Sequence, residues 1–319
     1  MRFYIAVLGT LLAFATPAIA QVDEIIANLA GGRVIILVAR DAILFGAIDH
    51  PLEATSVPPR VAQIDRGHVA IFLGASEWQI PAAPKPIRLD HDIPRVYAPD
   101  PHYVQPGDVE NDLEQIGVSF LERLRPLVSQ LHHKIDLKPD DPLLQIVLIG
   151  YAPKNYGPEV WLIEYHVEQQ QPGAQADYLQ TRVLRPRFTQ LYPPEKHDAH
   201  TLVEIRSPES LPGIPLLGLI QQNDPRIAKL RSSDPRFAKV IDTIERGQVQ
   251  KAVSEDAADF LRATLPLISD KANFIQGTLG ESYGFQWVVP PDEPIEKATT
   301  PEEKNRPAEA PTLTRKPHP

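Results

Sequence analysis

The chain has 319 residues, with 41 acidic and 32 basic side chains, a formal net charge of -9 at pH 7 and no cysteine. The absence of cysteine excludes disulfides and metal sites built on thiolates. No basic block stands out, which argues against nucleic acid or an anionic membrane as the main partner.

The first 20 residues have the pattern of a secretory signal. One Arg is followed by an apolar run and then by the small residues Ala18 and Ala20 on either side of Ile19. The apolar run is too short to span a bilayer. We therefore expect cleavage after Ala20, a secreted or periplasmic protein that begins near Gln21, and no stable membrane anchor. A buried first helix is the alternative.

The opposite end of the chain, residues 290–319, is crowded with Pro, Glu and Lys and has no aromatic residue. Such a segment buries too little apolar surface to offset the entropy lost on ordering it. We expect a disordered or polyproline-like tail, which could dock a protein partner. Residues 21–289, between the two ends, have the length of one large domain with an insert at residues 79–107.

The first segments of this domain predict a short helix followed by two β-hairpins. Residues 21–30 begin with acidic residues and carry apolar residues at helical spacing, which predicts a short amphipathic helix. Residues 34–39 and 43–48 are apolar runs around a charged turn, and they predict a hairpin buried on both faces. Residues 60–64 and 68–73 predict a second hairpin. A hairpin buried on both faces requires a sheet that lies between other layers.

The insert at residues 79–107 is dense in Pro and has no helical period. This composition predicts a long irregular segment, and replacing residues 81–106 with a short linker would then spare the fold. Trp78 just before the insert, with Tyr97 and Tyr103 inside it, supplies rings that can contact a ligand or a neighbouring subunit at low entropic cost. A loop that merely covers a sheet edge is the alternative.

The rest of the domain mixes helices and strands. Apolar residues at helical spacing predict amphipathic helices over residues 108–134 and 254–275, each with a proline inside. The pattern Asp-Pro-Arg occurs at Asp224 and again at Asp234, and each copy predicts the start of a helical turn with Asp as N-cap. Further strands are predicted at residues 143–151, 158–167, 178–184, 201–205 and 283–289.

Several of these features match a known family in order and spacing. Two apolar strands around Arg40 and Asp41 lead to Asp49 and Arg60, and the next two strands contain Gln63, Ile64, Asp65 and Gly74. A later strand pair adds Gly150, Gly157, Pro158, Trp161 and Tyr165, and a helix with a closing strand ends the domain. Together, these features resemble proteasome-type subunits, a branch of the N-terminal nucleophile hydrolases. The resemblance covers less than half of the chain and implies a four-layer α/β/β/α sandwich of two antiparallel sheets; an α+β domain with one sheet is the competing fold.

The chemistry of that family requires a Thr, Ser or Cys whose own free α-amino group acts as the base. The resemblance places Gly32 or Arg33 at this position, and neither has a nucleophilic side chain. It therefore implies a non-catalytic protein that works in binding or assembly, either alone or as a homo-oligomeric ring. Asp49 and Arg60 correspond to the supporting acid and base; their other interpretation is a structural ion pair or exposed loop charges. The alternatives are a hydrolase with a relocated nucleophile and a protein that docks a partner through its Pro-rich tail.

Other polar groups are weaker candidates for a site. His197 and His200, with Asp198 between them, offer two imidazoles and a carboxylate to a surface metal ion, but no third His has a suitable spacing. Glu164 and His166 share one face of a strand, which is more typical of cross-strand packing than of catalysis. No Gly-rich phosphate loop, Gly-x-Ser-x-Gly elbow or His-Glu-x-x-His helix is present, so we expect no cofactor.

Overall fold

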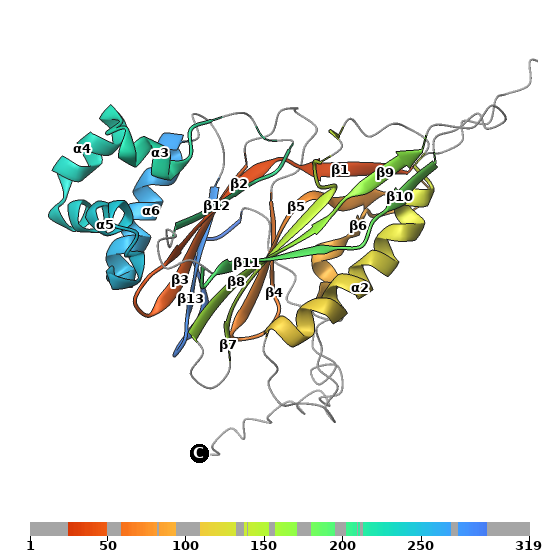
Figure 1. Cartoon of the computed structure of the whole chain (residues 1–319), viewed down its shortest axis with the longest axis horizontal. Coiled ribbons are helices and arrows are strands. Elements are labelled where there is room, and N and C mark those ends of the chain that lie inside the picture. The colour runs from red at the N-terminus through yellow and green to blue at the C-terminus, as the bar shows by residue number, and fades with distance from the viewer. Residues whose placement is uncertain are drawn as a thin grey trace, which may run out of the picture.

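The computed structural model describes residues 25–49, 59–81, 83–93, 109–131, 137–138, 140–152, 157–170, 180–194, 202–208, 210, 213–268 and 274–291. Within these residues the fold is mixed α+β, with two main antiparallel sheets, a two-stranded ribbon and five α-helices (Figure 1). The predicted signal, nearly all of the tail and the second half of the insert lie outside the described residues. None of the described helices is long and apolar enough to cross a membrane.

The first main sheet has five strands in the order β12, β2, β3, β13, β14. All seven residues of β2 are buried, and β2 pairs with β3 along its whole length. The first predicted hairpin is therefore confirmed, and its continuous apolar sequence explains its burial on both faces. The bounds are β2 (Gly32–Val38), β3 (Ala42–Asp49), β12 (Leu202–Arg206), β13 (Phe274–Gly280) and β14 (Gly284–Val289).

The second main sheet has seven strands, arranged around the 12-residue strand β5. Its order is β1, β5, β7, β8, β11, and β4 and β6 also pair with β5. The second predicted hairpin is confirmed as β4 and β5, and the predicted later strand pair as β7 and β8. The bounds are β1 (Ile26–Ala30), β4 (Arg60–Gln63), β5 (His68–Gln79), β6 (Ile87–Arg88), β7 (Leu144–Ala152), β8 (Gly157–Tyr165) and β11 (Arg187–Tyr192).

A two-stranded ribbon continues the edge of this sheet. It consists of β9 (Val167–Gln170) and β10 (Gln180–Val183), which pair antiparallel with Val183 opposite Val167. Strand β9 directly follows β8, and β10 precedes β11, which is the partner of β8. The ribbon is therefore a continuation of the β8–β11 pair, and α2 lies beside the ribbon (Figure 1).

Helix α2 and the group of helices α3–α6 lie at different ends of the molecule (Figure 1). Both Asp-Pro-Arg repeats start helices as predicted: the carboxylates of Asp224 and Asp234 accept the backbone N–H groups of Arg226 and Arg236. The bounds are α2 (Val109–Ser129), α3 (Leu216–Gln221), α4 (Pro225–Ser233), α5 (Pro235–Glu245) and α6 (Ser254–Ile268), with the 3₁₀ turns η1 (Leu89–His91) and η2 (Val249–Lys251).

The core consists of three hydrophobic clusters, and successive residues of the central strands enter different clusters. On β5, Phe72 belongs to the cluster that contains the apolar face of α2, whereas Ile71 belongs to a cluster shared with β2 and β3. On β2, Ile36 belongs to that shared cluster, whereas Ile35 belongs to the cluster that contains α3–α6. Both sheets thus have the alternation expected of strands buried on two faces.

The helix predicted for residues 21–30 is wrong in its described part, because Ile26–Ala30 form the strand β1. This strand pairs with β5, with Ile26 opposite Gln79 and Ala30 opposite Gly74. Strand β5 runs through Gly74, at a φ of 81°, and continues well beyond its predicted end. Its free backbone groups supply partners for β1, and this pairing overrides the helical spacing of the apolar residues.

The predicted helix over residues 254–275 is too long at its C-terminal end. Helix α6 ends at Ile268, and Phe274 begins β13. Phe274 and Ile275 pair with Ile48 and Ala47 of β3. A partner this remote in sequence cannot be inferred from a local helical period.

The insert is not wholly irregular in its described part. Residues Ile87–Arg88 form β6, which pairs with Glu77 and Trp78 of β5, and a 3₁₀ turn follows. Leu89 and Ile93 are buried, with 1% and 0% exposure, in the same cluster as α2. This part of the insert therefore belongs to the core, contrary to the expectation that a linker could replace it.

Candidate functional site

The position at which the resemblance expects a nucleophile lies at the start of β2. Gly32 follows β1 after a single residue, so its nitrogen is a backbone amide inside a continuous chain. This N–H donates to Ser210 Oγ at 2.8 Å, and the Ser210 hydroxyl donates to the Gly32 carbonyl at 2.6 Å. A Cβ atom on residue 32 would lie 2.5 Å from Pro59 Cγ and 2.6 Å from the Ile48 carbonyl oxygen. The position therefore has no room for the side chain of a Thr, Ser or Cys.

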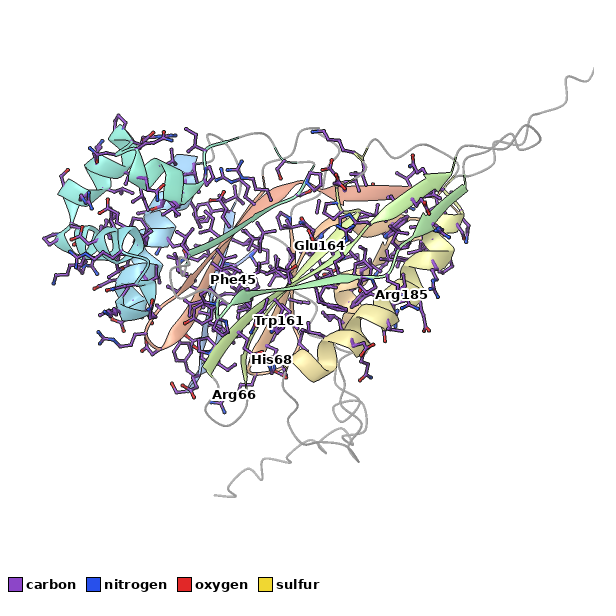
Figure 2. All side chains as sticks on the ribbon, in the orientation of Figure 1. Phe45, Arg66, His68, Trp161, Glu164 and Arg185 are labelled. Atoms are coloured by element: carbon purple, nitrogen blue, oxygen red, sulfur yellow. The ribbon has the colours of Figure 1, made fainter. Side chains whose placement is uncertain are left out.

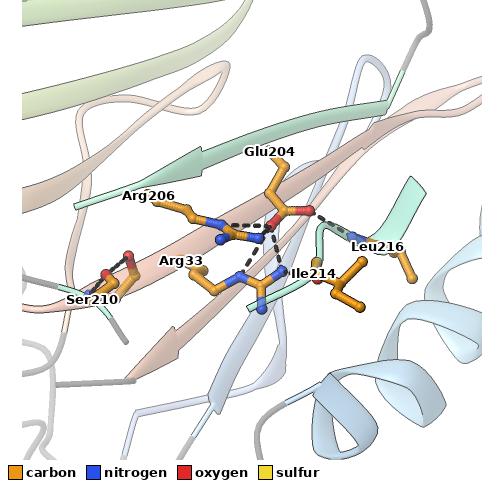
Figure 3. A network of polar contacts seen from close by, with 7 residues as sticks. Arg33, Glu204, Arg206, Ser210, Ile214 and Leu216 are labelled. Atoms are coloured by element: carbon orange, nitrogen blue, oxygen red, sulfur yellow. Dashed lines mark hydrogen bonds and ion pairs between the residues drawn. The ribbon is translucent and has the colours of Figure 1, made fainter. Parts of the chain in front are cut away.

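Arg33, the next residue, takes part in a buried ion pair (Figure 3). Its side chain is 1% exposed, and its Nε lies 3.0 Å from Oε1 of Glu204 on β12. The guanidinium also donates to the Ile214 carbonyl at 3.1 Å. Glu204 accepts further hydrogen bonds from Arg206 and, through Oε2, from the backbone N–H of Leu216 at 2.8 Å. This network joins β2, β12 and the start of α3.

Arg60 takes part in a second ion pair. Its Nη2 lies 2.9 Å from Oε2 of Glu77 on β5, and Glu77 also accepts from the Asn28 amide of β1 at 3.0 Å. Asp49 ends β3 opposite Gly32, and its side chain lies outside the described residues. Glu77 thus ties together β4, β5 and β1 through its contacts with Arg60 and Asn28.

The aromatic residues predicted to contact a ligand are Trp78, Tyr97 and Tyr103, and the structure describes only the first of them. Trp78 is fully buried in the cluster with α2, and its Nε1–H donates to the Ala75 carbonyl at 2.9 Å. It is a core residue, so ligand contact would be left to Tyr97 and Tyr103, which lie outside the described residues.

The predicted metal ligands His197 and His200 also lie outside the described residues. Among the residues that the structure does describe, no group of three or more His, Asp or Glu side chains could hold a metal ion.

A groove lies between α2 and the β10 edge in the described structure. Its volume is about 550 Å³. Three arginines are among its lining residues, and none of the described lining residues is acidic; Figure 2 labels one of these arginines, Arg185, close to α2. The lining residues are Arg125, Ser129, Thr181, Arg182, Val183, Leu184 and Arg185.

His166 lies at the junction of β8 and β9, next to this edge. It is 3% exposed and lies near the Asp141 backbone. Burial lowers the pKa of His166, and the nearby Arg187 cation lowers it further, whereas the carboxylates of Glu164 and Asp140 and a hydrogen bond with the Asp141 backbone act to raise it. A neutral imidazole is therefore favoured in the folded protein.

Sequence reasoning missed Glu204, Ser210 and the groove. Glu204 lies in a short strand between Val203 and Ile205, and a carboxylate within an apolar strand is a signal for a paired acid, because acidic side chains are almost never buried alone. The groove gives no such signal, since α2 and β10 are far apart in the sequence.

No protein-family model and no curated protein sequence matches this chain.

Proposed function

We propose that this chain is a non-catalytic protein of the proteasome-subunit type, with a four-layer α/β/β/α sandwich, that works by binding or assembly. We propose further that it is exported through the signal in its first 20 residues.

The three clusters of the core support the layering. One contains α2 and residues of the seven-stranded sheet, one contains α3–α6 and residues of the five-stranded sheet, and the third contains residues of both sheets. Because side chains alternate between the faces of a strand, such a division is what two face-packed sheets with outer helices would produce.

The observation that carries the non-catalytic proposal is the packing around Gly32. A nucleophile of the family type needs a side-chain hydroxyl or thiol and a free amine on the same residue. Gly32 has an amide nitrogen bonded to Ser210 and a Cα enclosed by Pro59 and the Ile48 carbonyl. Arg33 has its guanidinium engaged by Glu204. Both candidate positions thus have structural contacts in place of a reactive group.

The mature N-terminus tests this proposal. The chain is expressed with its first 20 residues in a bacterial host, and the exported protein is analysed by intact mass and N-terminal sequencing. It is then treated with a peptide β-lactone, which acylates N-terminal Thr and Ser nucleophiles, with an active N-terminal-Thr hydrolase as positive control. We expect a start near Gln21 and no covalent adduct. A start at Ser or Thr together with an adduct would favour the relocated-nucleophile hydrolase.

Native mass spectrometry of the same protein distinguishes assembly from binding. A discrete multiple of the chain mass would support a homo-oligomer. A monomer would instead favour a function in binding another protein. Deletion of residues 290–319 would then test whether the tail is the segment that binds this partner. If the tail is the docking element, its deletion should abolish the interaction and leave the melting temperature unchanged.

A further inference from the structure

The groove between α2 and β10 concentrates positive charge in a chain whose net charge is -9. Arg125 comes from α2 and Arg185 from the segment that joins β10 to β11. Within the described structure, neither guanidinium has an ion-pair or hydrogen-bond partner, whereas Arg182 pairs with Glu168. Two cations on opposite walls are therefore available to a ligand.

Thr181 supplies an independent indication of a ligand. It is only 8% exposed and lines the groove, and its Oγ1 has no hydrogen-bond partner among the described residues. Buried hydroxyl groups are nearly always hydrogen-bonded, so an unpartnered one in the wall of a cavity points to a group that binds there. The hydroxyl of Ser129 differs, because it already donates to the Pro126 carbonyl at 3.0 Å.

We propose that this groove binds the oxyanion of a small ligand, either a carboxylate or a phosphate group. Arg125 and Arg185 contribute charge-assisted N–H donors from the two walls, and the planar guanidinium suits both kinds of oxyanion. The Thr181 hydroxyl oxygen has almost no exposed surface in the free protein, and it donates once the exposed arginine side chains turn toward the ligand. Val183 and Leu184 contact the apolar part of the ligand. A small ligand is favoured over a polyanion because the negative charge of the rest of the chain repels a long one.

The site involves none of the residues around Gly32, so it goes beyond the proposed function and can fail without affecting it. Isothermal titration calorimetry of the purified protein at low ionic strength, with inorganic phosphate in one arm and glutarate in the other, tests it. We expect saturable binding with one site per chain in at least one arm. The arm that binds identifies the source of the oxyanion, and absence of binding in both arms overturns the proposal.

Charge-removing variants locate the site. Arg185→Gln and Arg125→Gln should each raise Kd about tenfold, because each removes a hydrogen bond to a charged group. Arg262→Gln is the matched control, since Arg262 is exposed on α6 and is not part of the groove. If Arg262→Gln weakens binding as much as Arg185→Gln does, the effect is general electrostatics and the proposal is wrong.

Thr181→Val separates a ligand-binding hydroxyl from a structural one. The substitution keeps the side-chain shape and removes a buried hydroxyl without a partner, so the melting temperature without ligand should stay the same or rise. Affinity for the anion should nevertheless fall several-fold. A loss of stability with unchanged affinity would show that the hydroxyl serves the fold, and would remove Thr181 from the site.

Discussion

Arg33 and Glu204 form a buried ion pair across the β2–β12 ladder, next to Gly32, where the proposed resemblance to proteasome-type subunits expects a nucleophile. Arg206 lies directly opposite Arg33 in the ladder, and Glu204 binds both cations. Without the carboxylate, two arginines would face each other across adjacent strands, one of them fully buried. The network therefore stabilises this end of the sheet, and its chemistry is that of a structural contact.

We expect Glu204→Ala to lower the free energy of unfolding by about 3–5 kcal/mol, because it leaves the buried Arg33 charge without an opposite charge beside it. It also removes the acceptor for the Leu216 N–H at the start of α3. Urea denaturation followed by circular dichroism measures the change.

The matched control is Glu168→Ala, which breaks the exposed pair with Arg182 and should cost less than about 1 kcal/mol. A double variant, Arg33→Met with Glu204→Leu, should recover much of the lost stability, because it removes both buried charges together. Equal effects of Glu204→Ala and Glu168→Ala would contradict the structural role of the network.

Gly32→Ser places a hydroxyl at the expected nucleophile position, and we expect it to give no hydrolase. The new Cβ would meet Pro59 Cγ at 2.5 Å and the Ile48 carbonyl oxygen at 2.6 Å. Such overpacking should destabilise the fold by about 1–3 kcal/mol. Gly67→Ala is the control, because the nearest atom to its Cβ would be Asp65 Oδ1 at 3.7 Å, an ordinary contact. Amide hydrolysis by Gly32→Ser above the level of the unsubstituted protein would refute the expectation.

The sequence predicts correctly those strands whose apolar pattern fits only one kind of structure. Residues 34–39 and 43–48 are apolar without interruption, so they had to be a hairpin buried on both faces, as β2 and β3 are. Residues Ile26–Ala30 carry an apolar pattern that fits either a helix or a strand, and the choice depends on the free edge of β5. Strand β11 was missed for a related reason: its sequence RFTQLY is mostly exposed or half-buried, and its partner β8 determines its structure.

The site was harder to predict than the fold, because its contacts join distant parts of the chain. Arg33 and Glu204 are 171 residues apart, and Gly32 and Ser210 are 178 apart. The resemblance drew attention to Gly32 and Arg33, but only the structure supplies the atoms that surround them. The walls of the arginine groove likewise come from α2 and from the segment after β9, with no shared motif.

His166 should make stability depend on pH in mild acid. Burial and Arg187 lower its pKa in the folded chain below the ordinary 6.5. As pH falls below about 6.5, the unfolded chain therefore binds a proton before the folded chain does, and stability decreases until the pH passes the folded pKa. Melting temperatures measured between pH 8 and pH 4 should show this loss, and His166→Gln should reduce it. Arg187→Gln should also reduce it, because the folded pKa then moves back toward the ordinary value. An identical pH profile in His166→Gln would exclude His166 as the cause.

Leu89 and Ile93 should be essential to the fold although they lie in a Pro-rich insert. Both are almost fully buried against the cluster that contains α2, and β6 anchors the preceding residues to β5. Leu89→Ala and Ile93→Ala should each lower the free energy of unfolding by about 2–5 kcal/mol, because each leaves a cavity in the core. Lys85→Ala, an exposed position in the same segment, should change it by no more than about 0.5 kcal/mol. Chemical denaturation of the three variants decides the matter. If all three unfold at the same denaturant concentration as the unsubstituted chain, this part of the insert is a dispensable loop after all, and its place in the core is wrong.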